Sequence, residues 1–147
     1  MSETGTRIKE DPLEEQRQLF DLLSQETRHQ VVRYILGHPK HLMSLDELDY
    51  MIPKSKGAID DQLDNLIEEG ILDLYEYPPN KDKRDLPSRF YGFTERGIQV
   101  LRDYQYLNNV PVLRAVYDNT KKSEKLERHQ DAPRPELPET VEQGLSL

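Results

Sequence analysis

The segment SLDELDYMIPKSKGAIDDQLDNLIEEGIL, residues 44–72, has the pattern of two short helices joined by a turn. Ser44 and Glu47 have the spacing of a capping box, which starts a helix, and a proline follows that helix. Ser55 suits the N-cap of the second helix. Gly70 suits its end. The apolar residues of the second helix form one stripe: Ile59, Leu63, Leu66 and Ile67.

The flanking sequence predicts further helices and one hairpin. Upstream, leucine-rich residues 12–23 and apolar residues 25–36 each show helical spacing. Downstream, residues 71–77 and 88–93 are rich in aromatic and branched side chains, which is typical of strands. The proline-rich loop 78–87 between them completes a β-hairpin with a long tip.

The remaining segments complete the predicted domain organisation. Thr94 suits the N-cap of another helix, and Pro111 suits the first turn of a last one. We expect a mainly α protein with a small β-hairpin, an α+β class. The predicted parts are a flexible N-terminus (1–11), a compact domain (12–107), a C-terminal helix (108–128) and an acidic, disordered tail rich in proline and glutamate (129–147).

The composition excludes several functions. The chain has 147 residues, a net charge of -8 and no cysteine, so thiol catalysis and thiolate metal binding are excluded. The acidic balance disfavours a general nucleic-acid binder and fits a halophilic cytoplasm. No apolar run is long enough to span a membrane, and no signal peptide is present, so we expect a soluble intracellular protein. We find no catalytic motif and expect no enzyme activity.

Three stretches resemble the winged helix-turn-helix regulators of the ArsR-like branch, particularly haloarchaeal ones. LFDLLSQETRHQVVRYIL (19–36) resembles the opening helices of that family, and residues 44–72 resemble its helix-turn-helix. SRFYGFTERGIQVL (88–101) resembles the returning wing strand and the helix that follows. The resemblance implies a winged helix-turn-helix domain with C-terminal dimerisation helices.

The resemblance also implies roles for individual residues. In the family, a recognition helix, here 55–69, enters the major groove of double-stranded DNA, and the wing, here 78–89, contacts the backbone. The matching positions are Ser55, Lys56, Gly57, Asp60 and Asp61 on the helix and Lys81, Lys83, Arg84 and Arg89 on the wing. Family members are usually homodimers joined through their first and last helices. The apolar candidates there are Leu13, Leu19, Phe20, Leu113, Val116 and Tyr117.

The acidic recognition helix leaves two functions open. Positions matching Asp60 and Asp61 usually hold a hydroxyl residue and a basic or polar one, and carboxylates repel phosphates. Molar salt screens this repulsion to within about 3 Å, so DNA binding stays compatible with the acidic helix. The alternative is that this acidic face binds a protein partner. The apolar stripe of the last helix likewise either joins a dimer or folds back on its own domain.

Other charged residues and the histidines give weaker signals. Arg28, Arg33 and Lys54 are further candidates for phosphate contacts. His38 and His41 in the GHPKH stretch lack the third and fourth ligands that a metal site needs, so we place them on a loop surface. We expect no metal and no cofactor, and the sequence identifies no effector.

Overall fold

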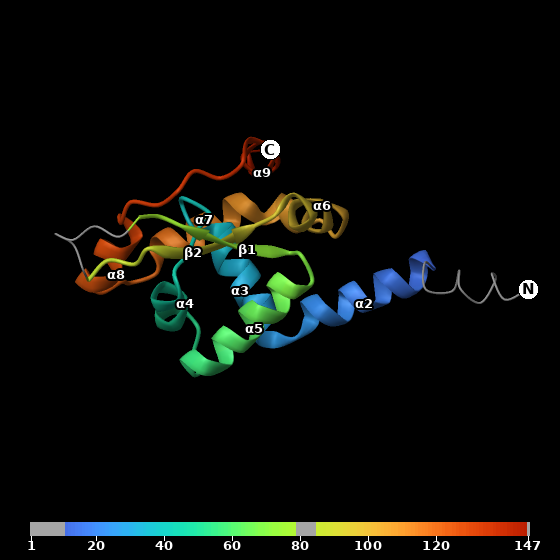
Figure 1. Cartoon of the computed structure of the whole chain (residues 1–147), viewed down its shortest axis with the longest axis horizontal. Coiled ribbons are helices and arrows are strands. Elements are labelled where there is room, and N and C mark those ends of the chain that lie inside the picture. The colour runs from blue at the N-terminus through green and yellow to red at the C-terminus, as the bar shows by residue number, and fades with distance from the viewer. Residues whose placement is uncertain (1–10, 79–84, 147) are drawn as a thin grey trace, which may run out of the picture.

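A computed structural model of the chain describes residues 11–78 and 85–146 (Figure 1). Helices dominate it, with one hairpin, as the sequence predicts. In chain order the elements are α2 (Pro12–Ser24), α3 (Glu26–Gly37), α4 (Leu45–Met51), α5 (Lys56–Glu68), β1 (Leu72–Glu76), β2 (Arg89–Phe93), α6 (Glu95–Asp103), the 3-10 helix η2 (Tyr106–Asn109), α7 (Val110–Asn119), α8 (Glu124–Gln130) and α9 (Glu139–Leu145).

Side-chain caps set the starts of the two helices in the opening segment. The Glu47 backbone N–H donates to the Ser44 hydroxyl at 3.2 Å, and the Ser44 backbone N–H donates to the Glu47 carboxylate at 3.0 Å. This confirms the predicted capping box at α4. The Ser55 hydroxyl accepts from the Ala58 backbone N–H at 3.1 Å, which confirms the predicted cap of α5.

The hairpin is antiparallel and gains a third short segment. Leu72 lies opposite Phe93, and Glu76 lies opposite Arg89. Met43, just before α4, exchanges two backbone hydrogen bonds with Tyr91, at 3.1 and 2.8 Å. The hairpin is thereby fixed to the helix-turn-helix formed by α4 and α5. This arrangement is a winged helix-turn-helix fold, in which the hairpin is the wing.

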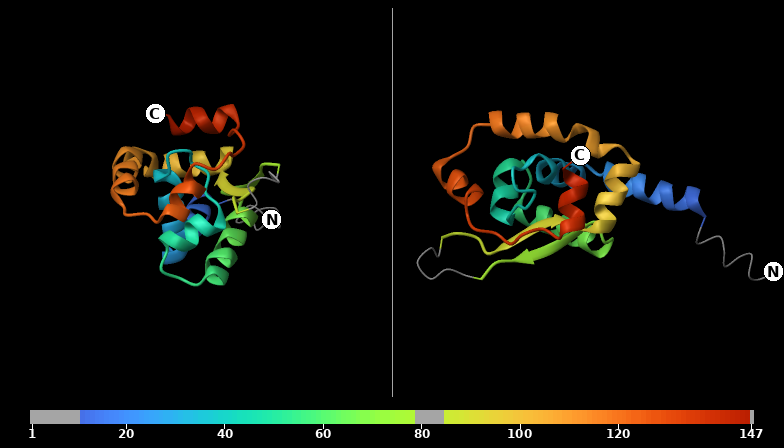
Figure 2. Two further views of the ribbon diagram at one scale, coloured as in Figure 1. Left: turned by 90° about the vertical axis from the view of Figure 1, so that its left-hand side faces the viewer. Right: turned by 90° about the horizontal axis from the view of Figure 1, so that it is seen from above.

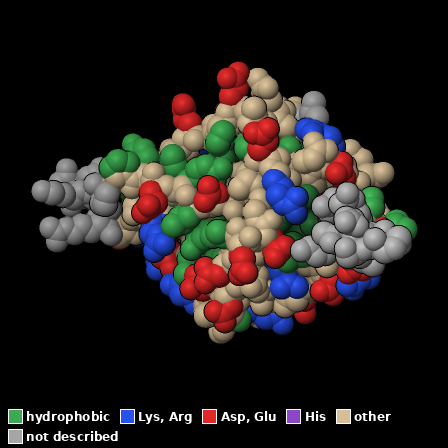
Figure 3. Space-filling model, turned by 45° about the vertical axis from the view of Figure 1, so that its right-hand side comes forward, with side chains coloured by type: hydrophobic (Ala, Val, Ile, Leu, Met, Phe, Trp, Pro, Cys, Tyr) green, Lys and Arg blue, Asp and Glu red, His purple; other side chains and the backbone are tan. Residues whose placement is uncertain are grey.

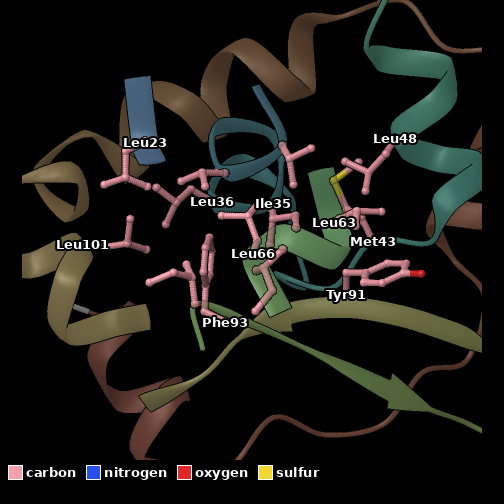
Figure 4. Close-up of a cluster of buried hydrophobic side chains, with 14 of the residues drawn as sticks. Leu23, Ile35, Leu36, Met43, Leu48, Leu63, Leu66, Tyr91, Phe93 and Leu101 are labelled. Carbon is pink, nitrogen blue, oxygen red and sulfur yellow. The ribbon is translucent and has the colours of Figure 1, made fainter. Parts of the chain in front are cut away.

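The core lies between α3, α5 and the sheet (Figure 4). The α5 stripe supplies Ile59, Leu63 and Leu66, each 0% exposed. They face Ile35 of α3 and Phe93 of β2, which are equally buried. Burying each such side chain contributes about 1.5–3 kcal/mol, so this stripe fixes the orientation of α5 on the domain.

The C-terminal segment differs from the sequence prediction of a disordered tail. Figure 2 shows it leaving α8, running beside the hairpin and ending in α9 next to α6. Its few apolar residues are spread along the chain, and each fills a separate gap. Ala132, Val141 and Leu145 are all buried. Composition suggested disorder because no continuous apolar face links these residues.

Arg134 links the C-terminal segment to the helix-turn-helix. Its side chain is 4% exposed and lies 3.5 Å from the buried Glu47 carboxylate. Its guanidinium also donates to the backbone carbonyls of Leu42, His129 and Ala132, and it stacks 4.5 Å from the centre of the Phe90 ring. An Arg at this position therefore adds donors to three buried carbonyls and to a buried acid, which also accepts from His38 and Ser44.

His38 belongs to the same buried cluster, which corrects its predicted place on a loop surface. It is 0% exposed. The Lys40 backbone N–H donates to Nδ1 at 3.0 Å, so the proton of the neutral ring is on Nε2, which donates to Glu47 at 2.9 Å. Burial lowers the pKa of His38, against the effect of Glu47, and keeps the imidazole neutral.

Replacing glycine by alanine is expected to change the stability of the fold in opposite directions at Gly97 and at Gly57. A Cβ at Gly97 would lie 2.2 Å from the Ile71 carbonyl oxygen, so Gly97→Ala is expected to destabilise the fold by about 1–3 kcal/mol. A Cβ at Gly57, in the first turn of α5, meets nothing within 4 Å, so Gly57→Ala is expected to stabilise it by up to about 1 kcal/mol. Urea unfolding at one KCl concentration measures both, and shifts of the same sign would contradict the prediction.

Candidate nucleic-acid interface

The first turns of α5 are accessible. Ser55, Lys56, Gly57 and Asp61 are exposed, and Asp60 is half-buried. The predicted helix residues therefore lie on the solvent side of α5, opposite the buried stripe. The open space around Gly57 allows another molecule to approach the backbone closely there.

The lysines beside α5 have carboxylate partners within the chain. Lys56 Nζ lies 2.6 Å from Asp46 of α4, and Lys54 Nζ lies 3.7 Å from Glu26 of α3. The hydrogen bond from Lys56 lowers the pKa of Asp46. Exposed pairs of this kind contribute about 0–1 kcal/mol, so a phosphate can displace the carboxylate at little cost.

The helix and the wing meet at Tyr91 of β2. Figure 4 shows the Tyr91 hydroxyl directed away from the other labelled side chains. Burial raises the pKa of this phenol, and the charges of Asp60 and Asp64 raise it further while Arg89 lowers it. The charges of all three side chains therefore act on the same hydroxyl. The predicted helix residue Asp60 and the predicted wing residue Arg89 shift its pKa in opposite directions.

One exposed ion pair joins α8 to the loop of the hairpin. Arg128 of α8 lies 3.2 Å from Asp85, where the returning part of the hairpin begins. Nothing in the sequence pattern pairs these residues, which are 43 positions apart. Arg89 is exposed on β2. The predicted contacts Lys81, Lys83 and Arg84 lie outside the described residues.

The exposed face of α5 is mainly acidic. α5 carries Asp60, Asp61, Asp64 and Glu68 against Lys56 alone. Figure 3 shows acidic side chains on the lower half of the molecule, at the height where Figure 1 places α5, with Lys and Arg side chains between them. Electrostatic attraction for phosphate on this face must therefore come from outside α5.

The predicted dimer residues fall into three groups. Leu13 and Phe20 of α2 and Val116 of α7 are 73%, 54% and 43% exposed. Leu19 and Leu113 are partly buried against the domain's own core. Tyr117 is 1% exposed and packs against His38, with ring centres 5.2 Å apart, which corrects its prediction as a dimer contact.

Of the two predicted phosphate contacts on α3, Arg28 is engaged within the chain. Arg28 Nε donates to the Leu22 carbonyl at 2.6 Å, and Nη1 donates to the Gln62 side chain at 3.0 Å. It therefore ties the end of α2 to α5. Arg33 lines a pocket shared with Tyr106 and α7.

The described residues limit other kinds of site. No helix in residues 11–78 and 85–146 is long and apolar enough to cross a membrane. In the same ranges, no cluster of three or more His, Asp or Glu side chains is arranged to hold a metal ion.

A comparison with solved structures supports the fold. The chain is similar to a protein from Halomicrobium mukohataei described as having a GntR superfamily winged-helix-turn-helix domain. The TM-score is 0.81 at 25% sequence identity, over 93% of this chain and 96% of that one. No family model and no curated protein matches the sequence. The match does not distinguish the ArsR-like branch, which stays a prediction.

Proposed function

We propose that this chain is a DNA-binding transcription regulator that reads double-stranded DNA with α5 and holds the backbone with its wing. The observation that carries the proposal is the winged helix-turn-helix fold with an open first turn of α5. Ser55, Lys56 and Gly57 form that turn, and side chains at the start of such a helix contact base edges. Arg89 is exposed on the hairpin and adds a positive charge there.

The proposal includes a homodimer. Exposed apolar side chains of α2 and α7 support it, because such faces on helices need a partner. These side chains are Leu13, Phe20, Val112 and Val116. A two-fold dimer would present two α5 helices to successive major grooves. Light scattering at high salt measures the mass, and a monomer would contradict this part of the proposal.

The acidic helix makes salt a necessary part of the mechanism. Repulsion between Asp60, Asp61 and the phosphates weakens binding at low ionic strength, and molar salt screens it to within about 3 Å. Base contacts remain possible because carboxylates accept a hydrogen bond from cytosine N4.

The test is fluorescence anisotropy with genomic DNA fragments from about 0.1 M to about 3 M KCl. We expect sequence-selective binding of the wild type to persist in molar salt. The triple variant Lys81→Ala, Lys83→Ala, Arg84→Ala should bind at least about tenfold more weakly, with a salt slope smaller by about 2–3. A folded dimer that binds no fragment at any salt concentration would overturn the proposal.

A protein partner is the second candidate function. The run of carboxylates on α5 favours it, since an acidic helix suits a basic protein surface better than a phosphate backbone. The double variant Asp60→Asn, Asp61→Asn separates the two functions. It should strengthen DNA binding at low salt if DNA is the ligand, and it should weaken capture of a basic partner if a protein is the ligand.

A further inference from the structure

A second candidate site, lined by basic and aromatic side chains, lies away from the proposed DNA-binding face. It is a pocket of about 350 Å³ between α3, the turn after α6, and the start of α7. This volume is at the lower end of the range for small-molecule sites, about 300–1,000 Å³. The pocket is lined by His29, Arg33, Tyr104, Gln105, Tyr106, Asn109 and Leu113.

The charge of this pocket is opposite to that of the protein. No aspartate or glutamate is among the lining residues, although the chain contains 28 of them and has a net charge of -8. His29 and Arg33 are four positions apart, so both project from the same face of α3. No ion pair joins Arg33 to a carboxylate in the part of the chain that the structure describes. Its guanidinium is available to an anion.

Two aromatic rings form the walls. Gln105 has a left-handed backbone (φ 65°), which a non-glycine residue adopts at an energetic cost and which is frequent at ligand-binding turns. Tyr104 packs against Phe20 of α2, with ring centres 4.9 Å apart and ring planes tilted by 30°, and the Tyr106 hydroxyl lies 3.3 Å from His29 Nδ1.

We propose that this pocket binds a small organic anion with one flat ring. Its carboxylate would pair with the Arg33 guanidinium, whose planar donors match the two carboxylate oxygens. Its ring would lie against Tyr104 and Tyr106, with Leu113 as the apolar floor. The pocket is spatially separate from the proposed DNA-binding face, because no lining residue belongs to α5 or the wing.

A second part of the inference rests on the proposed function. Tyr104 connects the pocket to α2, since its hydroxyl donates to the Gln16 carbonyl at 3.4 Å. α2 carries Leu13 and Phe20, which we propose as dimer contacts. A ligand that holds Tyr104 would therefore favour one position of α2, and so one spacing of the two DNA-reading helices.

Benzoate is the probe, with neutral benzamide as its matched control. Both are titrated into the full chain without DNA, at the lowest KCl concentration that keeps it folded by circular dichroism. NMR follows the ring signals of Tyr104, Tyr106 and His29. We expect saturable shifts with benzoate and at least tenfold weaker binding of benzamide, because charge-assisted hydrogen bonds are the stronger ones.

Arg33→Gln is the test variant and Arg102→Gln is the control. Arg102 is exposed on α6 and donates to Gln99 of the same helix. Arg33→Gln should weaken benzoate at least tenfold and leave benzamide unchanged, while Arg102→Gln changes neither. Three outcomes would overturn the proposed site. They are the absence of a saturable shift, equal binding of benzoate and benzamide, and equal benzoate binding in the two variants. If Arg33→Gln fails to fold, the benzoate–benzamide contrast in the wild type decides.

Fluorescence anisotropy of labelled DNA, with and without saturating benzoate, tests separately whether ligand binding changes the affinity for DNA. A changed DNA affinity supports this coupling, and an unchanged affinity with benzoate bound overturns it. Failure to bind DNA under either condition contradicts the proposed function instead, and the titration without DNA still decides the ligand site.

Discussion

Replacing Arg134 by methionine is expected to lower the free energy of unfolding by about 3–5 kcal/mol. Methionine keeps most of the side-chain volume beside Phe90, so the loss is mainly electrostatic. The Glu47 carboxylate, 0% exposed, would keep only the hydrogen bonds from His38 and Ser44. The carbonyls of Leu42 and His129 would also lose a buried donor.

Urea unfolding at constant KCl measures this effect, and Arg128→Met is the matched control. Arg128 also pairs with a carboxylate, but both side chains are more than half exposed, at 56% and 63%, so its loss should cost about 1 kcal/mol or less. Adding Glu47→Gln to Arg134→Met should recover part of the loss, because an amide leaves no buried charge. Equal costs for the two arginine variants would contradict the structural role of Arg134.

Acid is expected to destabilise the fold well before its carboxylates titrate. Burial, together with the Arg114 charge, lowers the pKa of His41 from 6.5 to about 4, despite the hydrogen bond to the Ile35 carbonyl. Between these two values the unfolded chain binds a proton that the folded chain does not, so stability falls as the pH falls. From pH 7 to pH 5, His41 should contribute a loss of about 2 kcal/mol.

Two other groups act in the same direction. His38, whose pKa burial also lowers, adds to the loss below pH ~6.5. Burial would raise the pKa of Glu47, but the hydrogen bond from His38 and the Arg134 charge outweigh it and lower that pKa. Its stabilising effect is therefore lost only at lower pH, from about 4.5 downward.

His41→Asn isolates the histidine effect. His41 has a left-handed backbone (φ 56°), which asparagine tolerates better than most residues. Urea unfolding of both proteins at pH 7 and pH 5 gives the comparison. The variant should lose about 2 kcal/mol less than the wild type over this interval. An equal loss in both proteins would exclude His41 as the cause.

The features that the sequence predicted correctly are those decided by neighbours along the chain. The Ser44–Glu47 capping box, the Ser55 and Thr94 caps and the α5 stripe each depend on residues within one or a few helical turns. The hairpin depends on two short aromatic runs that flank a proline-rich loop. These local signals were sufficient for the winged helix-turn-helix fold.

The features that it missed depend on pairs far apart in the chain. Arg134 reaches the Leu42 carbonyl 92 positions away, and no periodicity marks either residue. Tyr117 has the spacing of the apolar stripe on α7, but α3 covers its side of the helix and leaves Val112 and Val116 exposed. An apolar stripe shows that a helix face will be covered, and it does not show which chain covers it.

The candidate interface was predictable only in part for a related reason. The helix positions of the site follow from the α5 stripe, because the polar side is opposite to it. The partners of the charged residues do not follow, and Lys56 with Asp46, or Arg128 with Asp85, are examples. The ligand pocket also escaped prediction, since α3, η2 and α7 meet only in the folded chain.

The contact between Glu47 and Arg134 also sets an order of events during synthesis. Arg134 follows Glu47 by 87 positions in the sequence. At the usual elongation speed of about 5–20 residues per second, the ribosome adds it roughly 4–17 s later. During that interval the Glu47 carboxylate has only the donors of Ser44 and His38, and the α4 cap that it completes remains reversible. The nascent helix-turn-helix therefore reaches its final stability only after the arginine has emerged.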